Sequence, residues 1–178
     1  MNLLSRIFVS IVIACALVFN STNAQISLPS DFADEVILTN VTEVTGVAID
    51  SSGKIFVSQH DGTVWRVNNG VKVSPPIIDI SQECGRWNAH GLMSITLDKD
   101  FTTNGYIYLY YTVDRHYLLN YGTPNYNPNA NEKNKATIDR VTRYQIDPTT
   151  NFTTLVPNSR FILLGKDKKN GISITYNN

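Results

Sequence analysis

Short strand patterns separated by tight turns recur along this chain, and this repetition limits the possible folds more than any other feature. The first unit has three β-type runs and a fourth that adjacent prolines interrupt: Thr45–Ile49, Lys54–Ser58, Thr63–Val67 and Val71–Ile80. No helical periodicity lies between these runs. Because proline cannot donate to a central ladder, we expect the run with Pro75-Pro76 at a sheet edge. The unit therefore predicts one antiparallel sheet.

A second unit repeats the pattern, with runs at Leu92–Leu97, Tyr106–Val113, Thr137–Ile146 and Arg160–Gly165. Asn104-Gly105 separates the first two runs, which favours a β-hairpin. A four-strand unit that recurs at roughly 40–50 residues is typical of a β-propeller. We therefore predict an all-β fold and a β-propeller. The second unit also contains an insertion, Asp114–Ala136, which we expect to be an aperiodic loop that is either functional or disordered.

The number of blades leads to a further expectation. Propellers typically close with 4–8 blades, and this chain holds about two. Two blades alone would leave unpaired sheet edges. We therefore expect residues 25–178 to be the incomplete N-terminal part of a larger propeller, either as a fragment or as a truncated gene product, and to fold poorly by itself.

The N-terminal residues resemble an export signal. Arg6 precedes the apolar run Ile7–Phe19, and Thr22 and Ala24 occupy the small-residue positions of a cleavage site. The sequence thus predicts a signal peptide at residues 1–24, cleaved near Ala24, and a secreted or periplasmic protein. The apolar run is shorter than the ~20 residues of a membrane span. A lipoprotein anchored through Cys15, in a lipobox-like setting, is the alternative.

Charge and cysteine content narrow the choice of partners. Lysine and arginine balance aspartate and glutamate, so nothing indicates a nucleic-acid partner. After cleavage Cys84 would be the only cysteine, which leaves two possibilities. It is either a buried free thiol, or its partner lies on sequence outside this chain.

A strand-like run at Glu35–Leu38 ends the lead-in to the first unit.

Candidate site residues cluster around the stretch Gly85–Val113, whose opening loop is polar and aromatic. Arg86 and Asn88 could hold a carboxylate or a sugar hydroxyl, since arginine binds carboxylates in a fork, or they could clamp the loop. His90 either lines a pocket or orders the turn at Gly91. His116, on the insertion, either reaches over a pocket or lies on a surface loop. His60 belongs to a His-Asp-Gly turn, and this setting favours a role as a solvated turn residue. No cluster has the residue spacing of a calcium loop or a zinc site, so we predict no metal ligands in this sequence.

Four ordered segments carry a resemblance to a known family: Thr45–Asp50, His60–Trp65, Trp87–Leu92, and Asp100-Phe101 with Asn104–Tyr108. From about Leu28 to its last residue the chain resembles the soluble quinoprotein glucose/sorbosone dehydrogenases. The resemblance implies a six-bladed propeller that binds pyrroloquinoline quinone (PQQ) and calcium at one end. It also implies oxidation of a sugar hydroxyl by hydride transfer to the quinone, with a histidine as general base.

The resemblance places that histidine beyond Asn178, so the catalytic residue within this chain is unknown. It also implies that the chain alone is inactive and that no cofactor site can be demonstrated from these residues. The alternative is a non-enzymatic propeller that binds carbohydrate or protein, and a histidine soon after Asn178 would discriminate the two. A hydrolase or lactonase-type propeller would need acidic calcium ligands near the channel.

Overall fold

The computed structural model describes residues 28–130, 132 and 135–166, which fall into two compact units that divide after Glu35. Residues 28–35 form a turn in which the Phe32 amide donates to the Pro29 carbonyl. The predicted run Glu35–Leu38 is not a strand. Val36 and Ile37 are 74% and 43% exposed, so burial does little to stabilise a strand there. The predicted signal peptide and Cys15 lie outside the described residues.

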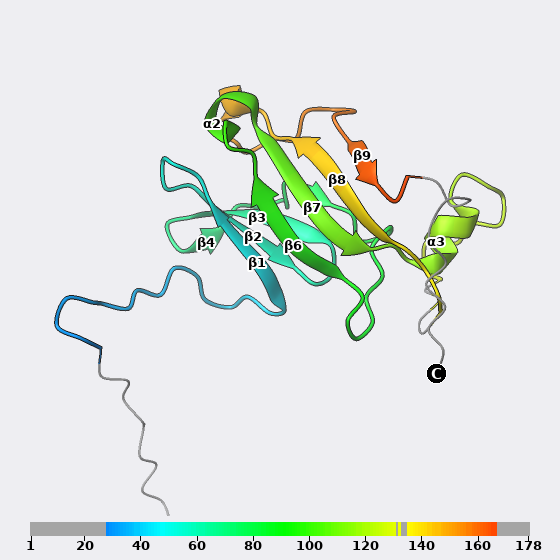
Figure 1. The fold of residues 1–178 in the computed structure, drawn as a ribbon, viewed down its shortest axis with the longest axis horizontal. Helices are drawn as coiled ribbons and strands as arrows, with labels where there is room; N and C mark the ends of the chain where they lie inside the picture. The colour runs from blue at the N-terminus through cyan, green and yellow to red at the C-terminus, as the bar shows by residue number, and fades with distance from the viewer. Residues whose placement is uncertain (1–27, 131, 133–134, 167–178) are drawn as a thin grey trace, which may run out of the picture. The chain divides into compact units, whose positions relative to one another are not determined.

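The first sheet contains β1 (Val44–Ile49), β2 (Ile55–Gln59) and β3 (Thr63–Asn68) in antiparallel order. Two short strands, β4 (Val71–Lys72) and β5 (Ile78–Asp79), both pair with β3. The run containing Pro75-Pro76 is therefore one interrupted strand at the sheet edge, which confirms the prediction from proline. Figure 1 shows these strands in cyan and teal.

The second sheet contains four antiparallel strands in chain order: β6 (Leu92–Leu97), β7 (Tyr106–Thr112), β8 (Asp139–Gln145) and β9 (Phe161–Leu164). The predicted antiparallel pair is confirmed, but its connection is not a simple Asn-Gly turn. A one-turn helix, α2 (Phe101–Asn104), fills it and ends at Gly105, which has φ of +67°. A Cβ at Gly105 would clash with the Ile146 carbonyl, so glycine is required there.

The insertion is more regular than the sequence predicts. It contains α3 (Arg115–Asn120), so the expectation of an aperiodic loop is wrong for these six residues. The Asp114 carboxylate accepts the Tyr117 amide at 2.9 Å and caps the helix. A helix this short presents too few positions for a periodic pattern to appear. Figure 1 shows α3 beyond the C-terminal end of β7. A short 3₁₀ turn, η1 (Pro148–Thr150), follows β8.

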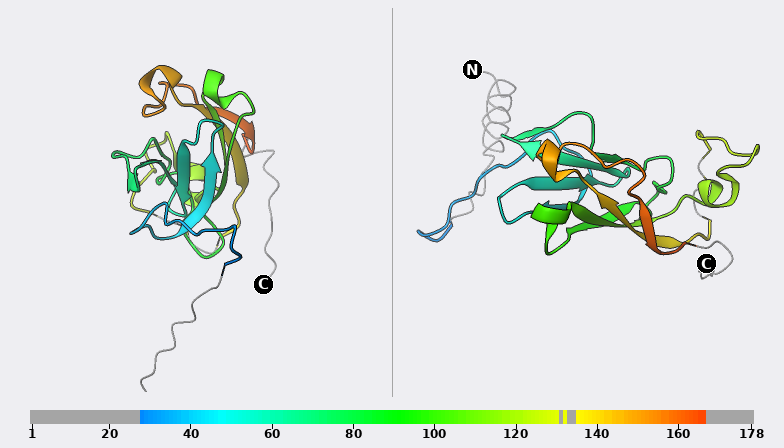
Figure 2. Two further views of the ribbon diagram at one scale, coloured as in Figure 1. Left: turned by 90° about the vertical axis from the view of Figure 1, so that its left-hand side faces the viewer. Right: turned by 90° about the horizontal axis from the view of Figure 1, so that it is seen from above.

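The core lies between the two sheets, which form two layers in the right-hand view of Figure 2. Alternate residues of β2 and β7, such as Phe56 and Leu109, are fully buried there. Phe101 of α2 closes one end of the core, with Phe56 edge-on at 5.2 Å and Phe152 stacked at 4.8 Å. Both sheets are thus anchored by one shared apolar layer. Among the residues that the structure describes, no helix is long and apolar enough to cross a membrane.

Candidate functional site

A cleft opens where three connecting segments meet at one end of the sheets. The chain entering β1, the turn between β2 and β3, and the loop between β5 and β6 each contribute to it. Its volume is about 800 Å³. The lining residues are Glu43, Val44, Thr45, His60, Asp61, Arg86, Trp87 and Asn88.

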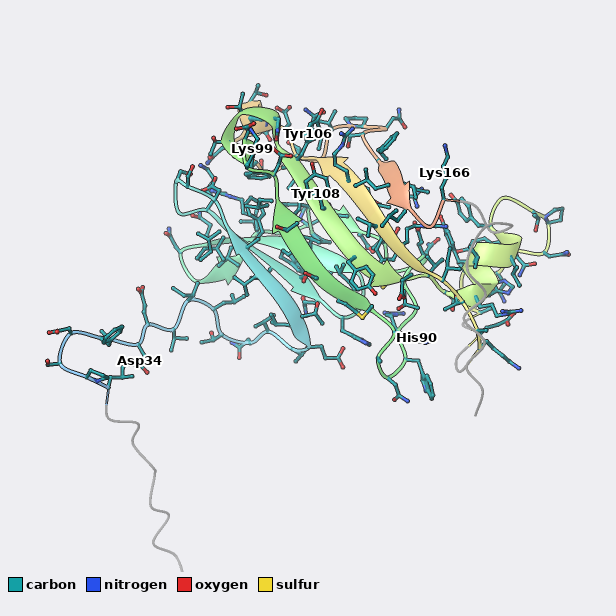
Figure 3. All side chains as sticks on the ribbon, in the orientation of Figure 1. Asp34, His90, Lys99, Tyr106, Tyr108 and Lys166 are labelled. Carbon is teal, nitrogen blue, oxygen red and sulfur yellow. The ribbon has the colours of Figure 1, made fainter. Side chains whose placement is uncertain are left out.

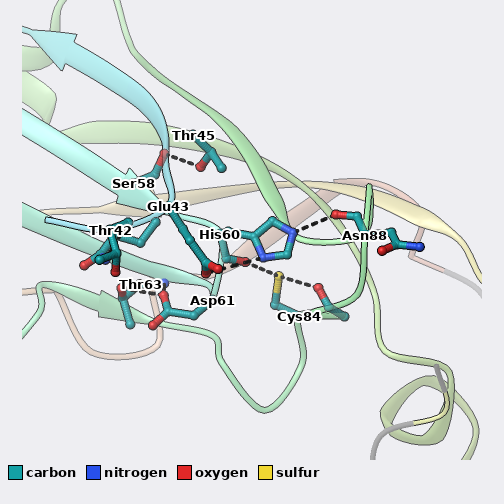
Figure 4. A network of polar contacts seen from close by, with 11 residues as sticks. Thr42, Glu43, Thr45, Ser58, His60, Asp61, Thr63, Cys84 and Asn88 are labelled. Carbon is teal, nitrogen blue, oxygen red and sulfur yellow. Dashed lines mark hydrogen bonds and ion pairs between the residues drawn. The ribbon is translucent and has the colours of Figure 1, made fainter. Parts of the chain in front are cut away.

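His60 is held in the cleft through both its backbone and its side chain. Its backbone amide donates to the Glu43 carbonyl at 2.9 Å, and its carbonyl accepts the Leu92 amide at 3.2 Å. The imidazole Nε2 lies 3.1 Å from the Asn88 carbonyl oxygen. Since a carbonyl only accepts, Nε2 carries the hydrogen in this geometry, and the neutral ring keeps Nδ1 as an acceptor. Figure 4 shows this ring between Glu43 and Asn88.

The carboxylate of Glu43 lies on the other side of the imidazole. Its Oε2 is 3.9 Å from His60 Nδ1, which is an ion-pair distance rather than a hydrogen bond, and it is formed only when the ring is protonated. When the ring is neutral, Nδ1 of His60 is therefore a hydrogen-bond acceptor beside the Glu43 carboxylate, and the Asn88 carbonyl holds the ring through Nε2. This arrangement can take a hydrogen bond from a hydroxyl group.

Glycine at position 91 makes this placement of His60 possible. A Cβ built on Gly91 would lie 2.4 Å from Cδ2 and 2.6 Å from Nε2 of His60. The imidazole therefore packs directly on the backbone of the residue that precedes β6. Gly91 has an ordinary backbone conformation, so space rather than φ is what requires glycine here.

The turn between β2 and β3 is held by its own hydrogen bonds. Asp61 Oδ1 accepts the Thr63 amide at 3.0 Å and the Thr63 hydroxyl at 2.7 Å, and that hydroxyl accepts the Trp65 indole N–H at 2.8 Å. Below the turn, Cys84 is a free thiol that is 1% exposed, which is one of the two alternatives from the sequence. Burial raises the pKa of the Cys84 thiol, so it stays protonated and packs as a small apolar group.

The structure brings some of the predicted site residues together and separates others. Arg86 and Asn88 both line the cleft, and Asn88 has φ of +50°, a left-handed conformation that asparagine tolerates. His90 stands outside the lining on the loop before β6 (Figure 3). Its amide donates to the Trp87 carbonyl at 2.8 Å, and its ring meets the Trp87 ring edge-on at 6.2 Å.

His116 belongs to the insertion and not to the cleft lining. Its Nε2 accepts the Asn127 amide at 3.0 Å, and its ring stacks on Tyr126 at 5.8 Å. Its Nδ1 lies 3.2 Å from the Asn120 amide nitrogen. His116 thus ties α3 to the loop that follows it. His60 lies in the turn that the sequence predicts, and it also lines the cleft, which the sequence did not predict. The strand order could have predicted this position of His60, because the start of β1 and the β2–β3 turn lie at the same end of an antiparallel sheet.

Comparison with known proteins decides the family. The family model for glucose/sorbosone dehydrogenase matches residues 42–166, which is more than half of the chain. The chain belongs to this family. The match includes both sheets and every segment that lines the cleft.

Two solved structures show the same fold. The PQQ-bound aldose sugar dehydrogenase of Streptomyces coelicolor is 18% identical, with a TM-score of 0.51, and the alignment covers 72% of this chain and 31% of that protein. The apo-form soluble aldose sugar dehydrogenase of Escherichia coli is 12% identical, with the same TM-score and the same coverage. These likenesses confirm the all-β propeller prediction. The chain spans about a third of the length of either protein. A comparison with curated sequences gave no significant match.

The hydrogen-bond donors and acceptors that line the cleft limit which ligands it could hold. Arg86 and the Asn88 amide offer hydrogen-bond donors, whereas Glu43 and Asp61 offer only acceptors. Within the described ranges, no group of three or more His, Cys, Asp or Glu side chains could hold a metal ion. The calcium that the family resemblance implies therefore stays a prediction without ligands assigned in this chain.

Proposed function

We propose that this chain supplies part of the active site of a PQQ-dependent sugar dehydrogenase. The observation that carries the proposal is the convergence of Arg86, Asn88 and His60 on one cleft in a chain of this family. Export of the protein and cleavage near Ala24 belong to the same proposal. They rest on the N-terminal sequence alone.

The lining residues fit an anionic quinone in part. The guanidinium of Arg86 is exposed to the cleft, and it suits a carboxylate of PQQ because arginine binds planar carboxylates in a fork. The Asn88 amide would add a donor beside it. Glu43 and Asp61 would repel a second carboxylate, so the quinone would contact the Arg86 side of the cleft. When bound, the quinone supplies the hydride acceptor.

The carboxylate side of the cleft suits the sugar. Neutral His60 presents Nδ1 as an acceptor, and Glu43 lies beside it, so both can accept hydrogen bonds from sugar hydroxyls. The Asn88 carbonyl keeps the imidazole in the tautomer that leaves Nδ1 available. In this proposal His60 orients the sugar, and no residue of this chain is assigned as the general base. The chain by itself would then bind the quinone weakly and would not oxidise sugars.

The test is quinone binding to the full chain by isothermal titration with PQQ. We expect Arg86→Ala to weaken the affinity about tenfold, the equivalent of about 1.4 kcal/mol, through loss of a charge-assisted contact. Arg115→Ala is the matched control, because Arg115 binds the Ala136 carbonyl and Glu132 within the insertion. Equal affinities for the wild type and Arg86→Ala would contradict the proposed placement. Sugar oxidation by the chain alone, with PQQ and calcium added, would contradict the proposed inactivity.

A further inference from the structure

A second groove lies away from the cleft, between the insertion helix and the outer part of both sheets. Its volume is about 490 Å³, within the range of small-ligand sites. It shares no lining residue with the cleft. Its walls come from β5 and the loop after it, from α3, and from β8 with the segment leading to β9. The lining residues are Ile78, Asp79, Ile80, Ser81, Gln82, Glu83, Tyr117, Tyr121, Tyr144, Leu155 and Arg160.

Three tyrosine rings of the insertion form a single cluster at this groove. Tyr117 and Tyr121 stack at 4.3 Å with an interplanar angle of 20°, and Tyr126 meets Tyr121 edge-on at 5.3 Å. The Tyr126 hydroxyl donates to Gln82 Oε1 at 3.3 Å, which joins the cluster to the loop after β5. Tyr121 is nevertheless 59% exposed. A large aromatic ring is thus held in place while its surface stays open to solvent.

A buried ion cluster forms the polar floor. Glu83 Oε1 accepts the Tyr111 hydroxyl at 2.6 Å, Arg140 Nη1 at 2.5 Å and Arg160 Nη2 at 2.6 Å. The side chains of Glu83 and Arg140 are 6% and 7% exposed, whereas that of Arg160 is 35% exposed. Glu83 therefore fixes the Arg160 guanidinium from behind, and the exposed part of the guanidinium faces the groove.

The groove offers hydrogen-bond groups of both kinds beside the rings. Arg160 is a donor, Asp79 is an acceptor, and the Gln82 amide is both. Asp79 Oδ1 accepts the Ser81 amide at 2.9 Å, so its carboxylate is held at the groove wall. A plain anion would gain from Arg160 but would be repelled by Asp79. A ring with apolar faces and hydroxyl groups on its rim matches the whole lining.

We propose that this groove is an accessory carbohydrate-binding site, in which a pyranose ring of an oligosaccharide packs on Tyr121 and bonds Arg160 and Asp79 through its hydroxyls. The site lies apart from the cleft and takes no part in oxidation. It anchors a polymeric or oligomeric sugar to the surface of the protein. This assignment does not depend on the quinone.

The test is a titration of the full chain with cellotetraose, maltotetraose and tetragalacturonate, without PQQ, followed by isotope-edited NMR. We expect at least one of the three to shift the groove resonances saturably. Tyr121→Ala should weaken that sugar about tenfold, whereas Tyr121→Phe should retain the affinity because it keeps the ring. Tyr110→Ala, a change of the same kind on the other side of the second sheet, should leave the affinity unchanged.

Three outcomes would overturn the proposal. No saturable binding of any of the three sugars is the first. Equal affinities of the wild type and Tyr121→Ala would show that the ring is not a platform. Displacement of tetragalacturonate by sodium acetate, with no binding of the neutral sugars, would reduce the groove to a carboxylate site. If the chain failed to bind PQQ but still bound the sugar in this groove, the proposed function would be wrong and the proposal of this site would stand.

Discussion

The buried carboxylate of Glu83 allows the sharpest prediction about the stability of this fold. Glu83→Ala removes the acceptor that Tyr111, Arg140 and Arg160 share. The contact joins the loop after β5 to β7, β8 and the segment before β9, so its loss affects the junction of both sheets. Arg140 would be left as a nearly unexposed guanidinium without its carboxylate.

The magnitude follows from this burial. Breaking a buried ion pair by removing one partner costs about 3–5 kcal/mol, because the remaining charge is uncompensated. Arg160 adds less, since its side chain is 35% exposed and solvent compensates part of its charge. We therefore expect Glu83→Ala to lower the free energy of unfolding by about 4 kcal/mol. That is a large share of the about 5–15 kcal/mol of a typical domain.

Urea denaturation of the full chain, followed by circular dichroism, measures this change. Lys99→Ala is the control, because the Lys99–Asp100 pair is exposed to solvent and its removal should leave the free energy of unfolding nearly unchanged. A double replacement of Glu83 and Arg140 by methionine should recover much of the loss, since no buried charge then lacks a partner at that position. A loss of under about 1 kcal/mol for Glu83→Ala would show that the Glu83 cluster does not hold the two sheets together.

Three further changes test separate parts of the structure. Gly91→Ala should displace the His60 ring, so the His60 side-chain NMR resonances should move; unchanged resonances would contradict the contact. Phe101→Ala should cost about 3–5 kcal/mol in urea denaturation, because it empties the space beside Phe56, and a loss below about 1 kcal/mol would contradict its role in the core. Hydrogen bonds from the Asp100 amide, Tyr108 and Asn104 lower the pKa of Asp98 to about 2 from its ordinary 3.8. The stability that Asp98 contributes is therefore complete above pH 3.8 and is lost as the pH falls through about 2. The melting temperature of Asp98→Asn should fall less steeply than that of the wild type over this range, and parallel curves would argue against the assignment.

Much of the fold was predictable because its strands are short, β-branched or aromatic, and separated by glycine turns. The eight runs of the two units all contain strands, and the Pro75-Pro76 interruption lies at the edge where proline must lie. The failures are equally physical. Glu35–Leu38 has strand composition but pairs with no strand among the residues that the structure describes, and composition alone does not reveal whether a partner exists. The α3 helix depends on the Asp114 cap and the tyrosine cluster, contacts that a six-residue pattern does not reveal.

The site was predictable only in part. Arg86 and Asn88 were found because polar residues crowd the loop before a hairpin, and the structure places them in one cleft. The position of His60 in the cleft was not predicted because it depends on Gly91 and on the Asn88 carbonyl, both about 30 residues away in the chain. Sequence pattern gives each turn by itself. Contacts between turns can be predicted only when it is known which strands pair.

The central claim is that the cleft built by His60, Asn88 and Arg86 is part of a quinone and sugar site. It can be tested by NMR of the three histidine side chains and of Asn88 during titration with PQQ. We expect His60 in the free protein to carry its hydrogen on Nε2. We also expect PQQ to shift the resonances of His60 and Asn88, while those of His116 stay in place. Saturable PQQ binding that leaves His60 and Asn88 unmoved would contradict the account.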